Sequence, residues 1–153
     1  MPVQSLEPIL ASLPIFSGLD KPYLELLTGC AANVVFKDND VLFREGEDAN
    51  AFYVIREGQV ALKLYVPGQG TVTIQTIDAG DVVGWSWLVP PHRWYFTAQA
   101  IGTTRAISLD GECLRGKCEA DHGLGYEFLK RFSNVMAQRL NATRLQLLDL
   151  YRK

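Results

Sequence analysis

The chain has 153 residues, of which 48% are hydrophobic and 21% are charged, and its formal net charge is −2. This length suits a single domain, residues 1–153, with its own core, and the slight acidity excludes overall basicity as a means of binding nucleic acid. No apolar run approaches the roughly 18 residues of a membrane-spanning helix. The first residues lack a basic start and a clear cleavage site, so no signal peptide is expected and a cytoplasmic location is predicted.

The N-terminal part, residues 5–32, is predicted to be helical. Apolar residues recur at helical spacing before Pro14, which ends the first helix. Asp20 can cap a second helix that has Pro22 in its first turn. Two short helices are therefore expected before the first strand.

The middle of the chain, residues 33–109, reads as short β-strands separated by turns. Apolar residues alternate with other residues in runs such as 60–66. Glycines recur at intervals of 10–12 residues at turn positions, namely Gly46, Gly58, Gly68 and Gly80. Evenly spaced short strands with such turns are typical of a sandwich, a jelly roll or a small barrel.

The C-terminal part, residues 110–153, is predicted to be helical again. Asp110 can cap a short helix, and residues 123–151 form a helix of about 40 Å at a rise of about 1.5 Å per residue. A broken heptad seam runs along this long helix through Leu129, Met136, Thr143 and Leu150, and through Leu140 and Leu147. We expect a two-fold dimer through this helix, the alternative being a helix that packs wholly on its own domain.

The cysteines give no sign of a disulfide framework. Cys30, Cys113 and Cys118 make an odd number and form no CxxC motif. Buried free thiols in a reducing compartment are therefore expected.

Four motifs occur in order along the chain. They are LPIFSGL at 13–19, FREGEDA at 43–49, the strand-and-glycine signature FYVIREGQV at 52–60, and GDVVG at 80–84. Their order and spacing resemble the cyclic-nucleotide-binding domain of the catabolite activator and fumarate–nitrate regulator family, over essentially residues 5–150. The resemblance implies an α+β fold that is mainly β: an eight-stranded jelly roll with N-terminal helices and a long C-terminal dimerisation helix.

The resemblance also points to a ligand-binding cassette after Gly84. In the family, a short helix follows this glycine, a Glu beside it binds the ribose, and an Arg about ten residues on pairs with the cyclic phosphate. Here Trp85 stands at the Glu position, and an indole only donates hydrogen bonds. Ser86 is a candidate acceptor one position along. Trp94 stands at the Arg position, and Arg93 precedes it, so Arg93 is either the anion-binding residue or a rim arginine stacked on an indole.

Aromatic residues crowd this cassette. They are Trp85, Trp87, Trp94, Tyr95 and Phe96. They either pack in the core and at a dimer contact, or form a box for a flat or apolar ligand with one anionic group, or fill the old pocket so that nothing binds. The candidate ligand-binding residues of the cassette are Gly84, Trp85, Ser86, Trp87, Arg93, Trp94 and Thr97.

Two further candidates lie on the long helix. Aligning residues 136–140 with the family's helix places Thr143 where a Thr contacts adenine, and Arg144 where the partner subunit contributes a residue. Thr143 is alternatively a small packing residue of the seam. Arg144 is either a second cation for a pocket or a solvated side chain.

The function implied by the resemblance is a dimeric ligand-sensing regulatory domain. Cyclic AMP or cyclic GMP is the candidate reversible ligand, but the loss of the Glu at Trp85 costs roughly 1.5–3 kcal/mol, which weakens binding about ten- to a hundredfold. No recognition helix is visible, so specific DNA binding is not expected, and a separate protein is expected to act as partner.

Two other function classes are alternatives. One is a protein-interaction scaffold that has lost nucleotide binding. The other is a cupin-type enzyme or redox sensor, which requires a metal or haem. His92 and His122 are far apart in sequence and no catalytic motif is visible, so neither a metal site nor an enzyme is expected.

Overall fold

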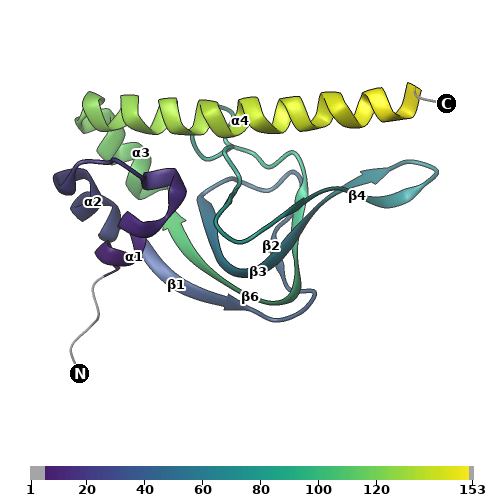
Figure 1. Cartoon of the computed structure of the whole chain (residues 1–153), viewed down its shortest axis with the longest axis horizontal. Helices are drawn as coiled ribbons and strands as arrows, with labels where there is room; N and C mark the ends of the chain where they lie inside the picture. The colour runs from purple at the N-terminus through teal and green to yellow at the C-terminus, as the bar shows by residue number, and fades with distance from the viewer. Residues whose placement is uncertain (1–5, 152–153) are drawn as a thin grey trace.

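The computed structural model describes residues 6–151, and Figure 1 shows its N-terminal helices at one end of a curled sheet. These helices are α1 (Glu7–Ser12), the 3-10 helix η1 (Pro14–Phe16) and α2 (Lys21–Thr28). As predicted, the first helix ends before Pro14, and Asp20 is the N-cap residue of α2, although its side chain makes no capping hydrogen bond.

One antiparallel sheet forms the jelly roll. Within residues 6–151 its strands are β1 (Ala31–Phe36), β2 (Val41–Phe43), β3 (Ala51–Val66), β4 (Gly70–Ile77), β5 (Val82–Val83) and β6 (Thr97–Asp110). The order is β1-β6-β3-β4, with β2 pairing to β6 and β5 pairing to β3. The predicted mainly β fold is confirmed, but six strands are present in this part of the chain where eight were expected.

Part of the difference in strand number has a local cause at Gly58. This glycine has a φ of +93°, as expected of a turn. The pairing of β3 with β6 nevertheless continues past it, with register shifts between Ile55 and Glu57 and between Glu57 and Gln59. Such irregularities bend a strand without ending it. Two expected short strands therefore form one strand of 16 residues.

Two helices complete the described chain, α3 (Gly111–Ala120) and α4 (His122–Tyr151). Asp110 caps α3 as predicted, because its carboxylate accepts a hydrogen bond from the backbone N–H of Cys113 at 3.1 Å. Figure 1 shows α4 running along the roll, with its C-terminal end on the side of the β3–β4 hairpin. No helix within residues 6–151 has the length and hydropathy of a membrane span.

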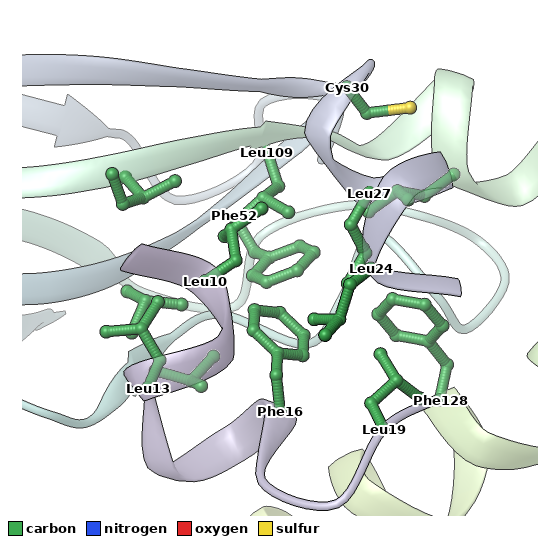
Figure 2. Packing of buried hydrophobic residues seen from close by; sticks show 14 of the residues in the cluster. Leu10, Leu13, Phe16, Leu19, Leu24, Leu27, Cys30, Phe52, Leu109 and Phe128 are labelled. Atoms are coloured by element: carbon green, nitrogen blue, oxygen red, sulfur yellow. The ribbon is translucent and has the colours of Figure 1, made fainter. Parts of the chain in front are cut away.

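The N-terminal half of α4 is fixed to the roll by aromatic packing. Phe128 and Phe132 of α4 are buried. The Phe132 ring meets the Phe52 ring of β3 edge to face, with centres 5.0 Å apart. Figure 2 shows Phe128 and Phe52 together with leucines of the N-terminal helices. The roll, the N-terminal helices and the first half of α4 thus share one core.

Cys30 and Cys113 form a disulfide, so the expectation of free thiols is wrong for these two residues. The sheet register explains how two cysteines separated by 83 residues in the sequence lie close together in the fold. β1 starts directly after Cys30 and pairs with the end of β6, with Ala31 opposite Leu109. Cys113 lies in the first turn of α3, so the two Cα atoms are only 5.9 Å apart. Cys118 is a free, half-buried thiol.

Reducing the Cys30–Cys113 bond is expected to lower the free energy of unfolding by about 2–4 kcal/mol, because the bond restricts a long loop of the unfolded chain. Urea unfolding with and without a phosphine reductant measures this loss. A Cys118→Ser variant should respond to the reductant as the wild type does, whereas Cys113→Ser should not respond. Equal stability of the wild type in both conditions would contradict the expectation.

Candidate functional site

A cavity of about 340 Å³ lies between the roll and α4. Its apolar wall includes Leu62 and Leu64 of β3, Ile74 of β4, Trp85, and Met136 and Leu140 of α4. Cavities of this size and character bind small molecules. A molecule held here contacts both the roll and α4.

Arg139 of α4 supplies a positive charge to this cavity. The residue is 9% exposed. Its Nη2 donates to the backbone carbonyl of Val82, and its guanidinium carbon lies 5.4 Å from the centre of the Trp85 ring, in a cation–π contact. Its Nη1 is buried and has no hydrogen-bond partner within the described residues. A buried donor without an acceptor is uncommon in folded proteins and is suited to binding an anion.

The guanidinium keeps its charge at neutral pH. Burial lowers the pKa of Arg139 from 12.5 to about 10, and the nearby carboxylate of Asp81 partly opposes this shift. The cavity therefore presents a cation in apolar surroundings, where an opposite charge is attracted more strongly than in water.

Trp94 fills the space directly above Gly84. Gly84 has a φ of +94°, and a Cβ atom placed on it would lie 2.5 Å from Cη2 of Trp94. The indole also stacks on the Phe43 ring, with ring centres 3.6 Å apart, and Trp94 is 4% exposed. A ligand therefore reaches the backbone of Gly84 only if the Trp94 indole moves.

Trp87 and Ser86 belong to the core. Trp87 is fully buried and stacks on Phe52 at 4.9 Å between ring centres. Its backbone carbonyl accepts a hydrogen bond of 2.6 Å from Arg115 of α3. Ser86 is 4% exposed. The segment between Gly84 and β6 contains turns in place of the short helix expected from the resemblance.

Arg93 lies outside the cavity between the roll and α4. Its guanidinium is 3.4 Å from the carboxylate of Asp48, and Nη1 donates to the backbone carbonyl of Gly46 at 3.0 Å. The side chain is 58% exposed. Arg93 is thus a rim arginine in this structure, although it is paired with a carboxylate rather than stacked on an indole.

The remaining predicted ligand residues are divided between the cavity and the surface. Trp85 and Thr143 line the cavity. The Thr97 hydroxyl instead accepts a hydrogen bond of 3.0 Å from the backbone N–H of Glu45, and Arg144 is exposed on α4. The ligand roles of all these residues stay predictions.

Arg139 is the residue that the sequence reasoning missed. It follows Phe132 by seven residues and shares the buried face of α4 with Phe128 and Phe132. The helical spacing therefore predicts an apolar residue at position 139. A charged residue at a position predicted to be buried is the sequence signal that could have identified Arg139 as a candidate.

An apolar stripe on α4 remains exposed along the same helix. Its members include Leu129, Leu140 and Leu147, which are 52%, 53% and 51% exposed. Among the described residues of α4 after Leu140, Ala142 is half-buried and all the others are exposed. Among the hydrogen bonds of residues 6–151, one joins the part of α4 after Leu140 to the roll. In it, the side chain of Gln146 donates to the backbone carbonyl of Ile74 at 3.3 Å. The C-terminal half of α4 thus presents an uncovered apolar surface.

The cyclic nucleotide-binding domain family matches residues 33–121. A "CRP-like cAMP-activated global transcriptional regulator" of Mycobacterium tuberculosis is 28% identical over 145 residues, which cover 95% of this chain and 63% of that protein. The chain therefore spans less than two thirds of the length of this curated relative.

Solved structures also resemble the chain. A cyclic nucleotide-binding domain from Methylobacillus flagellatus has a TM-score of 0.79 at 18% identity, covering 95% of this chain and 82% of that one. The regulatory subunit of a cAMP-independent protein kinase A from Trypanosoma brucei has a TM-score of 0.69 at 23% identity, covering 85% and 46%. These likenesses show that the fold is shared.

Proposed function

Because the chain belongs to the cyclic nucleotide-binding domain family, we propose that it is the ligand-sensing part of a regulator. The observation that carries this proposal is the cavity whose walls come from both the roll and α4. A ligand that contacts both parts favours one position of α4 over others, and the position of α4 in turn sets the affinity for the ligand. α4 therefore transmits occupancy of the cavity.

The family's way of binding a cyclic nucleotide is expected to be lost here. Trp85 and Trp94 replace the Glu and the Arg of the resembling cassettes, and Trp94 covers Gly84. Each lost charged hydrogen bond weakens binding about ten- to a hundredfold. Cyclic AMP and cyclic GMP are thus weak ligands in this proposal, and another molecule is sensed.

The signal is proposed to pass to a second copy of the chain. The exposed stripe through Leu129, Leu140 and Leu147 lies on one side of α4, and exposed apolar surface of this extent marks an interaction site. In a two-fold dimer, the stripe on α4 of one copy packs against the same stripe on α4 of the other copy, so both stripes are covered. A separate protein that reads the change completes the proposal.

Occupancy of the cavity is expected to change the dissociation constant of the dimer, by a factor of roughly 5 to 150 for a typical coupling. Thermal unfolding with a panel of cyclic nucleotides, nucleotides and organic acids identifies a ligand, and sedimentation equilibrium with and without it measures the coupling. An Ile74→Trp variant, in which the cavity is filled, should show neither effect. A ligand that binds the cavity and leaves the dimer unchanged would favour an interaction scaffold instead.

A further inference from the structure

The geometry points to a class of ligand for the cavity between the roll and α4. We propose that it binds an apolar or aromatic molecule with a single negative charge, and that Arg139 holds this charge in place of the cassette. This inference rests on the proposed function, because it names the ligand of the same cavity.

The charge of Arg139 has no direct counterion in the part of the chain that the structure describes. The ion pairs within residues 6–151 are Arg93–Asp48, Arg105–Glu57, Lys130–Glu127 and Arg131–Glu127, and none of them includes Arg139. Asp81 acts on Arg139 only from beyond ion-pair distance. The unpartnered Nη1 is itself buried, so an acceptor group of a ligand reaches it only when the Arg139 side chain turns toward the cavity. One negative charge then balances the guanidinium.

The rest of the cavity selects against a strongly polar ligand. Leucine, isoleucine, methionine and phenylalanine side chains form much of the wall beside Trp85. Gln75, Tyr95 and Thr143 add polar groups, although Tyr95 is 60% exposed and the Thr143 hydroxyl already donates to the carbonyl of Arg139 at 2.9 Å. A ribose or another polyol would leave several hydroxyls without partners, which costs free energy for each of them. An apolar body with one anionic group is the better match.

The stability of the fold gives a further reason. Burying a cation with an open donor is unfavourable, and its replacement by an apolar residue of similar size is often neutral or stabilising. Arg139 lies on the helix face that otherwise carries Phe128 and Phe132. A charge kept at such a position at a cost in stability is the pattern of a functional site.

Two fluorescent probes with the same aromatic body test the proposal. 8-Anilinonaphthalene-1-sulfonate carries one negative charge, and N-phenyl-1-naphthylamine carries none. We expect the wild type to bind the sulfonate about ten- to a hundredfold more tightly than the neutral probe. Arg139→Met should remove this preference, because it should weaken binding of the sulfonate far more than binding of the neutral probe.

Matched controls separate the cavity from the surface. Arg93→Met and Arg144→Met remove exposed cations, so both variants should keep the preference for the sulfonate. Ile74→Trp should weaken both probes, because the residue lines the cavity. If Arg139→Met fails to fold, Arg139→Lys replaces it: this variant keeps the charge and should keep a preference for the sulfonate.

Equal affinities of the wild type for the two probes would overturn the inference, as would a preference that survives Arg139→Met. In either case binding that Ile74→Trp abolishes would leave the proposed sensing function intact. Failure of the wild type to bind either probe, or binding that Ile74→Trp does not alter, would count against the inference and against the cavity as a sensing site.

Discussion

Replacing Trp85 with glutamate and Trp94 with arginine is expected to create a cyclic AMP site, whereas the wild type is expected to show no saturable binding below millimolar concentrations. The double substitution supplies the two charged groups that the resembling cassettes use for ribose and phosphate. At about ten- to a hundredfold for each group, the gain in affinity is roughly a hundred- to ten-thousandfold.

The geometry at Gly84 explains why both substitutions are needed. The Trp94 indole lies directly on this glycine and stacks on Phe43. Trp94→Ala should open the space without supplying a cation, so it should not bind cyclic AMP tightly. Trp94→Arg alone should gain part of the affinity, and Trp85→Glu alone should gain least, because the indole of Trp94 still covers Gly84.

Isothermal titration calorimetry with cyclic AMP and cyclic GMP measures these affinities, since the substitutions remove the tryptophans that fluorescence would report. Circular dichroism shows whether each variant is folded. A folded double variant that binds no cyclic nucleotide would mean that the segment between Gly84 and β6 has diverged beyond its two key residues. Micromolar binding by the wild type would instead make it an ordinary cyclic-nucleotide sensor.

Features that depend on neighbouring residues could be predicted from the sequence. The cap at Asp110, the end of the first helix before Pro14 and the long C-terminal helix all follow from short-range signals, and the structure confirms them. The bend at Gly58 could not be predicted in this way. Whether a glycine ends a strand or only bends it depends on the pairing of β3 with β6, which lies elsewhere in the chain.

The candidate site needed three-dimensional information. Trp87 turns toward the core below the N-terminal helices, whereas Trp94 turns into the roll onto Phe43. The buried side chains of Trp87 and Trp94 fix the two ends of the loop between them, and Arg93 lies at the surface beside Asp48. The disulfide is equally non-local, because only the register of β1 against β6 brings Cys30 close to Cys113.

Leu147→Glu is expected to convert the proposed dimer into a monomer at concentrations where the wild type is paired. Leu147 is 51% exposed in the single chain and lies two turns after Leu140 on the same stripe. A two-fold interface buries the exposed half of this leucine in both copies, which contributes about 1.5–3 kcal/mol for the pair. The dissociation constant should therefore rise about ten- to a hundredfold.

Leu145→Glu is the matched control for this dimer. Leu145 is 55% exposed, but it lies five residues after Leu140 and so on a different side of the helix. Sedimentation equilibrium should find this variant dimeric like the wild type. Both variants should keep the fold, because neither side chain is buried in the single chain. Equal disruption by the two substitutions, or a wild type that is monomeric throughout, would contradict a two-fold interface on this stripe.

The same interface bears on the cavity. Leu140 lines the cavity and is also 53% exposed, so the wall of the cavity and the dimer stripe meet at this residue. A second α4 packed on the stripe covers that edge and restricts the escape of a bound molecule. Leu147 lies outside the cavity lining. Leu145→Glu adds the same charge to α4, so the loss of sulfonate-probe affinity in Leu147→Glu that exceeds the loss in Leu145→Glu is attributed to the dimer. Linkage requires this loss to match the factor by which the probe strengthens the dimer.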